Sequence, residues 1–240
     1  MSRTSWNRLA DKFETDVCDI TRTETSNQLS RCVDAVAPSP RRSVLVDLGC
    51  GIGTFIQQFG DRFREIVAVD IAPRMVERAK ERCNGGLPQT TWFAMGIERA
   101  AKLIGTRADL TVCLNVITSP QRARQHGLWA SVAAVTKPRG YALVVVPSIE
   151  SARMVRAVET RGRKRVKPRE AGGVVRRADV WEKHYAREEL DALLPRYGLV
   201  ARRIAHGYFP WTQEGLTKPR SSDASPWDWV CLAQRVADAA

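Results

Sequence analysis

The most informative stretch of this chain reads Val44-Leu45-Val46-Asp47-Leu48-Gly49-Cys50-Gly51-Ile52-Gly53-Thr54. Its apolar run is too short for a helix and is followed at once by glycines, which predicts a buried parallel strand over residues 43–48. The glycines leave the backbone open to close approach by a ligand where the strand turns into a helix. The stretch therefore predicts a ligand-binding strand–turn–helix unit.

The same strand pattern recurs along the chain. Apolar runs predict further strands at residues 66–70, 90–95, 109–115, 141–146, 199–206 and 227–234, and helical stretches separate most of them. This alternation predicts an α/β fold, with a Rossmann-like, mostly parallel sheet and helices on both faces. A length of 240 residues is sufficient for one such domain and short for two.

Two carboxylates accompany the glycine turn. The dinucleotide fingerprint G-x-G-x-x-G would need a glycine where this chain has Thr54, which argues against a nicotinamide dinucleotide. Asp47, at the carboxyl end of the first strand, would repel a pyrophosphate but favour an ammonium or sulfonium group. Asp70 ends the second strand, where it is placed to accept hydrogen bonds from ribose hydroxyls. Adenosine joined to a charged amino acid satisfies these constraints.

The strands and turns of this region resemble those of a known family. Residues 44–55 look like motif I of the class I S-adenosylmethionine-dependent methyltransferases, and Val67-Ala68-Val69-Asp70-Ile71-Ala72-Pro73-Arg74-Met75 looks like their second motif. Residues 108–117 and 136–141 are similar to the fourth-strand motif and to the turn before the fifth strand. The resemblance covers about residues 43–150. It implies a seven-stranded sheet whose last strand is antiparallel, S-adenosyl-L-methionine as cofactor and S-adenosyl-L-homocysteine as product.

The resemblance also implies roles for single residues. Asp47 and the glycines of the turn would contact the methionine part of the cofactor, Asp70 the ribose, and Ile71 and Met75 the adenine. The chain departs from the family after the third strand, where Ala94-Met95-Gly96-Ile97-Glu98 leaves the adenine amino group to Glu98 or to backbone groups. The expected cofactor-binding set is Asp47, Leu48, Gly49, Cys50, Gly51, Gly53, Asp70, Ile71, Met75, Gly96, Ile97, Glu98, Asn115 and Val116.

No motif identifies a catalytic residue. In-line methyl transfer needs an aligned nucleophile and no covalent protein intermediate, and a general base helps only with some acceptors. Asn115 ends the fourth strand, where it either takes part in the site or caps the loop. His184 and Tyr185 precede a helix predicted at 187–196, and either line the acceptor pocket or pack at the helix entry. Tyr208, in an aromatic segment, either walls a substrate cavity or packs in the core.

The chain is expected to form a single domain, residues 1–240. Its N-terminal helices resemble the aromatic lid that many small-molecule methyltransferases fold over the cofactor, which excludes water. Loops as long as 207–226 are often functional. The expected parts are a helical lid at 1–40, a cofactor-binding core at 43–150, a basic insertion at 153–180, and a C-terminal helix and strands at 181–240 with the loop 207–226 on the substrate side.

The net charge of +12 is concentrated in one segment. Residues 153–177 hold ten lysines and arginines against Glu159 and Glu170. The segment is either a solvated insertion, a clamp for an acidic small substrate or a nucleic-acid contact. The absence of aromatic residues from 161–177 argues against binding of single-stranded RNA.

We therefore expect a methyltransferase that acts on a small-molecule acceptor. Two alternatives stay open, an RNA methyltransferase that uses the basic segment and a non-catalytic protein that binds the cofactor for a partner. No run of about 18 apolar residues exists and the N-terminus is charged, so we expect a cytoplasmic protein with no membrane partner. The six cysteines are scattered, which predicts no metal site. The acceptor atom and the oligomeric state stay open.

Overall fold

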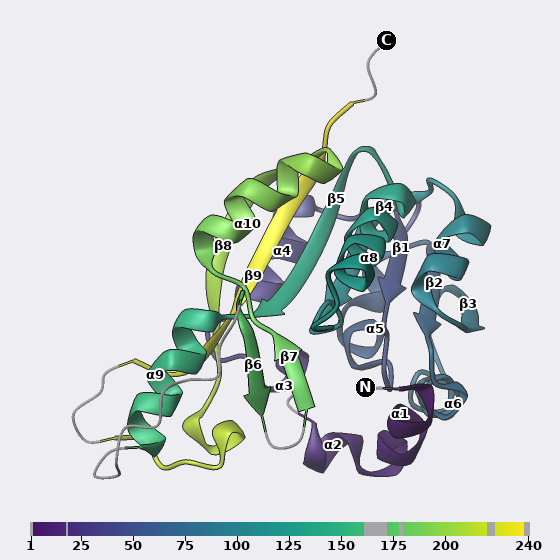
Figure 1. The fold of residues 1–240 in the computed structure, drawn as a ribbon. Helices are drawn as coiled ribbons and strands as arrows, with labels where there is room; N and C mark the ends of the chain where they lie inside the picture. The colour runs from purple at the N-terminus through teal and green to yellow at the C-terminus, as the bar shows by residue number, and fades with distance from the viewer. Residues whose placement is uncertain (1, 18, 161–171, 178–179, 220–223, 238–240) are drawn as a thin grey trace.

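The computed structural model describes residues 2–17, 19–160, 172–177, 180–219 and 224–237. Their main feature is a seven-stranded sheet of order β3-β2-β1-β4-β5-β9-β8, beside a separate two-stranded sheet of β6 and β7 (Figure 1). The strands are β1 (Val44–Leu48), β2 (Glu65–Asp70), β3 (Gln89–Ala94), β4 (Ala108–Leu114), β5 (Thr136–Pro147), β6 (Val174–Arg177), β7 (Val180–Lys183), β8 (Leu199–Tyr208) and β9 (Trp227–Arg235).

The strand directions confirm the predicted fold class. The first five strands pair in parallel, and β9 pairs antiparallel with both β5 and β8. The chain moves from β1 outward through β2 to β3, and then crosses back to β4 on the other side of β1. This reversal opens a crevice at the carboxyl ends of β1 and β4, which is where open α/β sheets bind ligands.

Helices cover both faces of the sheet, as predicted (Figure 1). One face packs against α7, α8 and α10, and the other packs against α4 and α5. All five residues of β1 are buried, because both of its faces are covered. The α-helices are α1 (Arg3–Leu9), α2 (Phe13–Asp16), α3 (Ile20–Thr23), α4 (Gln28–Val36), α5 (Thr54–Phe59), α6 (Pro73–Arg82), α7 (Ile97–Ile104), α8 (Arg122–Val135), α9 (Ile149–Glu159) and α10 (Arg187–Leu193).

Two local predictions differ from the structure. The first forty residues form four α-helices rather than one or two, because polar residues interrupt them and Asn27 takes a left-handed conformation just before α4. The predicted turn at 136–141 belongs to β5, whose register shifts there so that Ala108 pairs with Thr136 and Leu110 with Tyr141. This bulge absorbs the extra residues without ending the strand.

The hairpin of β6 and β7 was not predicted. Of the basic insertion expected at 153–180, the end of α9 forms the beginning and the hairpin forms the end, while 161–171 and 178–179 lie outside the described residues. The hairpin is held to the core through Lys183. Its amide donates to the Thr118 carbonyl at 2.8 Å, and its buried ammonium donates to Glu189 at 2.6 Å and to the Gly172 carbonyl at 2.9 Å.

Within the described ranges, no helix is both long enough and apolar enough to cross a lipid bilayer.

Candidate functional site

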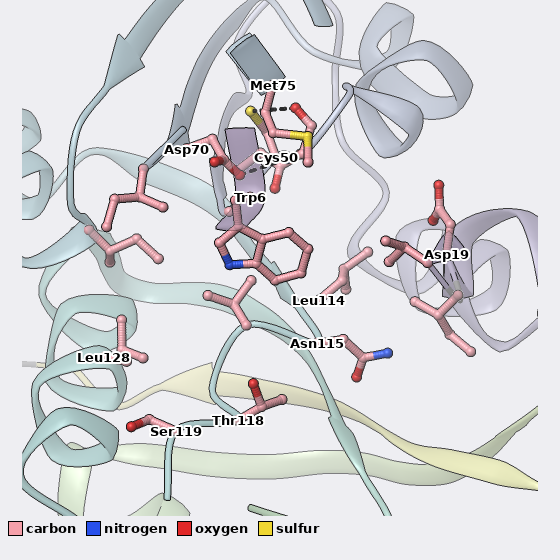
Figure 2. Close-up of a pocket in the computed structure, with 18 of the residues that line it drawn as sticks. Trp6, Asp19, Cys50, Asp70, Met75, Leu114, Asn115, Thr118, Ser119 and Leu128 are labelled. Atoms are coloured by element: carbon pink, nitrogen blue, oxygen red, sulfur yellow. Dashed lines mark hydrogen bonds between the residues drawn. The ribbon is translucent and has the colours of Figure 1, made fainter. Parts of the chain in front are cut away.

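A pocket lies beyond the carboxyl ends of the central strands (Figure 2). The glycine turn after β1 and the ends of β2 and β4 form its floor, and the start of α7 forms one side. Residues from the N-terminal helices and from β7 close it from the outside. In Figure 1 these covering segments lie at the end of the molecule to which β1 and β2 point.

The glycine turn needs glycine for two different reasons. Gly49, Gly51 and Gly53 have φ values of 88°, 52° and 80°, in the left-handed region that other residues avoid. A Cβ on Gly49 would also lie 2.3 Å from Val116 Cγ2, so the turn can approach the segment after β4 only without a side chain. The amides of Gly49 and Cys50 both donate to the Val69 carbonyl, which ties the turn to β2.

Asp70 lies at the end of β2, against the same turn. Its Oδ2 accepts from the Gly51 amide at 3.1 Å and its Oδ1 accepts from the Ala72 amide at 2.8 Å. Burial raises the pKa of this carboxyl, although these backbone hydrogen bonds oppose the increase. Each carboxylate oxygen has a second lone pair, so Asp70 can still accept hydrogen bonds from a ligand in the pocket.

Asp47 is the most deeply buried acid of the pocket, with 2% of its surface exposed. Its Oδ2 is buried and has no hydrogen-bond partner among the described residues. Burial, then the charge of Asp70 and then that of Asp19, raise its pKa from 3.8 to about 8. A buried acceptor without a donor is unfavourable. The site therefore favours a ligand that brings a hydrogen-bond donor and a positive charge.

Asn115, which follows β4, forms another part of the pocket wall, in the left-handed conformation at φ 55°. Its Nδ2 donates to Asp228 Oδ2 at 2.8 Å, while its Oδ1 is buried and unpaired among the described residues. The backbone amide of Asn115 donates to the Val145 carbonyl at 2.9 Å. Loop capping is thus not the role of this side chain, which presents an acceptor at the pocket wall.

The N-terminal helices cover the pocket and are fastened to α6. Trp6 and Phe13 both line the pocket, and the Trp6 indole lies centrally among the labelled side chains of Figure 2. Arg74 pairs with Asp11 at 2.6 Å, Arg82 pairs with Glu14 at 2.6 Å, and the Arg78 guanidinium donates to the Ala10 carbonyl. These contacts hold the aromatic side chains over the cavity.

The structure places most of the expected cofactor-binding residues around this single pocket. Leu48 and Gly53 are the exceptions. Leu48 is fully buried in the sheet core, and a Cβ on Gly53 would meet Cys83 Sγ and Ala79, so that glycine allows α5 and α6 to pack closely. The expected residues that do line the pocket are Asp47, Gly49, Cys50, Gly51, Asp70, Ile71, Met75, Gly96, Ile97, Glu98, Asn115 and Val116.

Of the candidate catalytic residues, only Asn115 lines the pocket. Tyr185 is completely buried, donates to the Ile117 carbonyl at 3.1 Å and packs edge-on against Trp129. His184 is also buried, with its Nδ1 3.2 Å from the Ser148 carbonyl oxygen. Tyr208 lies 2.8 Å from His206 Nδ1, in an aromatic cluster with Trp227. These three side chains therefore pack elsewhere in the fold.

The expected substrate-side loop, 207–226, contributes no described residue to the pocket. Trp211 instead is buried and donates from Nε1 to the Ala224 carbonyl. The wall comes from the unpredicted hairpin and from two other segments that carry no motif in the sequence. These additional lining residues are Asp19, Ile20 and Thr21 before and within α3, Thr118, Ser119 and Pro120 after β4, and Val180, Trp181 and Glu182 on β7.

The pocket fits the cofactor that the sequence implies. The unpaired oxygen of Asp47 suits an ammonium or sulfonium group, and Asp70 suits neighbouring hydroxyls. Ile71, Met75 and Ile97 supply an apolar surface of the kind that an adenine ring needs. S-adenosylmethionine carries all of these groups.

Comparison with known proteins agrees with this geometry. Residues 45–140 match the family model of a methyltransferase domain. No curated protein matches the chain in sequence. Among solved structures, a putative methyltransferase from Bacillus halodurans is 13% identical and superposes with a TM-score of 0.62, over 88% of this chain and 100% of that one.

Two further solved structures have the same fold. The 1,6-didemethyltoxoflavin-N1-methyltransferase of Burkholderia thailandensis is 14% identical, with a TM-score of 0.60 over 97% of this chain and 84% of that one. The magnesium protoporphyrin IX methyltransferase of Synechocystis is 14% identical, with a TM-score of 0.58 over 97% and 94%. Residues 45–140 thus match a methyltransferase domain, and the chain has the Rossmann-like fold of these solved methyltransferases.

Proposed function

We propose that this chain transfers a methyl group from S-adenosylmethionine to a small-molecule acceptor. The observation that carries the proposal is one pocket, lined by the glycine turn and Asp70 and also by Asn115 and Trp181. An acceptor in this pocket lies next to the cofactor and beneath the N-terminal helices.

Different side chains hold different parts of the cofactor. Asp47 holds the ammonium of the methionine part, Asp70 accepts from the ribose hydroxyls, and Ile71 and Met75 pack against adenine. The bound cofactor supplies a methyl group already activated by a sulfonium. The protein therefore needs only to bind, to align the acceptor and to exclude water.

The N-terminal helices perform the last of these tasks. Trp6 and Phe13 lie over the glycine turn, and the ion pairs of Arg74 and Arg82 hold their helices to α6. Water excluded by such a lid cannot compete for hydrogen bonds with the buried acceptors. Opening of the lid would admit the acceptor and release the products.

The charge of the pocket argues against a nucleic-acid acceptor. Five carboxylate side chains and one guanidinium line it among the described residues, so its interior is acidic although the chain as a whole is basic. A phosphate backbone would be repelled there. Two of the structural neighbours are also named as methyltransferases of small molecules, 1,6-didemethyltoxoflavin and magnesium protoporphyrin IX.

Two measurements test this function. Calorimetric titration with S-adenosylhomocysteine should show binding, and absence of heat at millimolar ligand would contradict cofactor binding. Incubation of the protein with tritiated S-adenosylmethionine and a cell extract should label the small-molecule fraction. Label confined to RNA or to protein would contradict the proposed acceptor class, and no label in any fraction would indicate a non-catalytic protein.

A further inference from the structure

The pocket is also lined by residues that are not needed to hold the cofactor, and we call this part of its lining the extension. Asp19 and Thr21 approach this extension from the N-terminal side, Asn115 from the end of β4, and Trp181 and Glu182 from the hairpin. In Figure 2, Asp19 and Asn115 lie toward one side of the cavity, opposite Leu128. This part of the pocket is therefore the place for the acceptor.

The extension presents hydrogen-bond acceptors without donors. Asp19 Oδ1 accepts from the Thr21 amide at 3.1 Å, but its Oδ2 is buried and has no partner among the described residues. Asn115 Oδ1 is buried and unpaired in the same way. A ligand that donates hydrogen bonds to both oxygens would satisfy two groups that the protein leaves unsatisfied.

The orientation of the Asn115 amide is determined by its partner. Its Nδ2 donates to the carboxylate of Asp228 at 2.8 Å. Rotation of the amide by half a turn would place Oδ1 against that carboxylate and lose the hydrogen bond. The oxygen, and not the nitrogen, therefore remains available, so the pocket selects a donor at this position.

Charge reinforces this selection. Asp19 is close enough to Asp47 to contribute to the raised pKa of the Asp47 carboxyl, after burial and Asp70. Glu182 lines the same part of the pocket. The carboxylates of Asp19 and Glu182, which are separate from the Asp47 that would hold the cofactor, favour a ligand with positive charge. A neutral alcohol would satisfy the hydrogen bonds but not the charge.

We propose that the acceptor is an amine, whose N–H groups donate to an unpaired acceptor in this acidic part of the pocket, Asp19 Oδ2 or Asn115 Oδ1. The inference rests on the proposed methyltransferase function and names the class of its acceptor. The amine binds as an ammonium ion and loses one proton to water. Its nitrogen lone pair then forms the new C–N bond, the C–S electron pair returns to sulfur, and the positive charge passes from sulfur to nitrogen. Asp19 stabilises the charge that develops on nitrogen.

The test compares three probes that share one ring: benzylamine, benzyl alcohol and phenylacetate. Ligand-observed NMR titrations measure the dissociation constant of each for the whole protein saturated with S-adenosylhomocysteine. We expect benzylamine to bind at least about tenfold more tightly than benzyl alcohol, as for one charge-assisted hydrogen bond. Phenylacetate should bind most weakly.

The variant Asp19→Asn should reduce the preference for benzylamine to less than about threefold. Asparagine also caps helices, so this variant keeps the start of α3. Asp61→Asn, which makes the same charge change on the exposed surface, is the matched control and should leave the preference intact. Affinity for S-adenosylhomocysteine should stay within about twofold in both variants.

Three results would overturn the inference: equal affinities for benzylamine and benzyl alcohol, no binding of benzylamine at millimolar concentration, or a preference that survives Asp19→Asn. The first two need no variant. The titration with S-adenosylhomocysteine alone separates the two proposals. If it binds and the amine preference is absent, only the acceptor class is wrong, whereas its failure to bind overturns the proposed function and this inference with it.

Discussion

Asn115 donates a hydrogen bond from Nδ2 to Asp228 Oδ2 at 2.8 Å, and so joins residues 113 positions apart in the chain. Asn115 follows β4 and Asp228 belongs to β9, with β5 between these strands in the sheet. This bond turns the amide so that its oxygen is the atom left without a donor at the pocket wall. Asp228, far from Asn115 in sequence, thereby sets which atom of the Asn115 amide stays unpaired.

Removal of the Asp228 carboxylate should impair ligand selectivity as well as stability. In Asp228→Ala the amide of Asn115 is free to rotate, and we expect the preference for benzylamine over benzyl alcohol to fall severalfold. The free energy of unfolding should decrease by about 1–3 kcal/mol, since a buried donor loses its partner. In the matched variant Asp228→Asn, the new amide oxygen can still accept, so most of the preference should remain. NMR titration and urea denaturation measure the two effects. Unchanged selectivity in Asp228→Ala would show that the orientation of Asn115 is unimportant.

Asp70→Ala should abolish most of the affinity for the cofactor. The variant removes the acceptor proposed for the ribose hydroxyls and also the acceptor of the Gly51 amide, which orders the turn. A loss of about 100-fold is expected, as for two hydrogen bonds to a charged group. Calorimetry with S-adenosylhomocysteine measures it. Glu77→Ala, exposed on α6, is the control and should bind normally. Equal affinities of these two variants would remove the basis of the proposed cofactor site.

Cofactor binding should depend on pH through Asp47. The pKa of its carboxyl in the ligand-free protein is about 8, so the group is mostly protonated at neutral pH. A cationic ligand favours the ionised form and must displace that proton. Affinity for S-adenosylmethionine should therefore increase with pH below about 8, by at most about tenfold per unit, and level off above it. Titrations in buffers of different ionisation enthalpy would measure the released proton. Proton uptake, or a constant affinity over this range, would contradict the assignment.

The same carboxyl predicts how stability varies with pH. Because its folded-state pKa lies above the unfolded value of 3.8, the folded protein binds more protons between these two values. Its contribution to stability is therefore fully present below about pH 4 and is lost as the pH rises toward 8. The variant Asp47→Asn has no ionisable group at this position, so its stability does not decrease for this reason between pH 4 and 8. It should therefore be more stable than the unaltered protein at pH 8, in thermal unfolding without ligand. A less stable variant there would contradict the raised pKa.

Gly49→Ala should destabilise the fold more than an alanine in an open turn. The new methyl would overlap Val116 Cγ2 in addition to the strain of φ 88°. Gly86→Ala is the matched control, because φ is 79° there and nothing lies within 4 Å. We expect a loss of about 1 kcal/mol for the control and about 2–4 kcal/mol for Gly49→Ala, from urea denaturation. Adding Val116→Ala to Gly49→Ala should recover part of the lost unfolding free energy. If nothing is recovered, the strain comes from the backbone conformation alone.

Trp181→Ala should affect the acceptor and not the fold. The indole is 40% exposed on β7 and lines the pocket, so its loss should change the unfolding free energy by less than about 0.5 kcal/mol. Benzylamine should bind about fivefold more weakly, because a ring near an ammonium contributes about 1 kcal/mol. Leu103→Ala, also exposed, is the control. If Trp181→Ala bound benzylamine as tightly as the unaltered protein, the hairpin would not contribute to the acceptor site.

Much of the fold, and the pocket shared by Asp47 and Asp70, could be predicted from the sequence, because these features depend on local pattern. A short apolar run followed by glycines specifies β1 and its turn wherever the segment lies in space. Asp47 and Asp70 end neighbouring parallel strands, and such ends meet at one edge of a sheet, so their sharing of one pocket follows from topology. The class of fold and the position of the glycine turn needed no coordinates.

The acceptor side could not be predicted in the same way. Asp19, Trp181 and Glu182 share a pocket with Asn115 only because the N-terminal helices and the hairpin fold back over the strand ends, and no spacing in the sequence encodes that arrangement. For Tyr185 the sequence left open both the acceptor pocket and packing at the helix entry, and the structure shows it buried in the core against Trp129. Local sequence determined the strands and the glycine turn. The rest of the pocket lining comes from segments far apart in the chain, and their meeting depends on the packing of the whole domain.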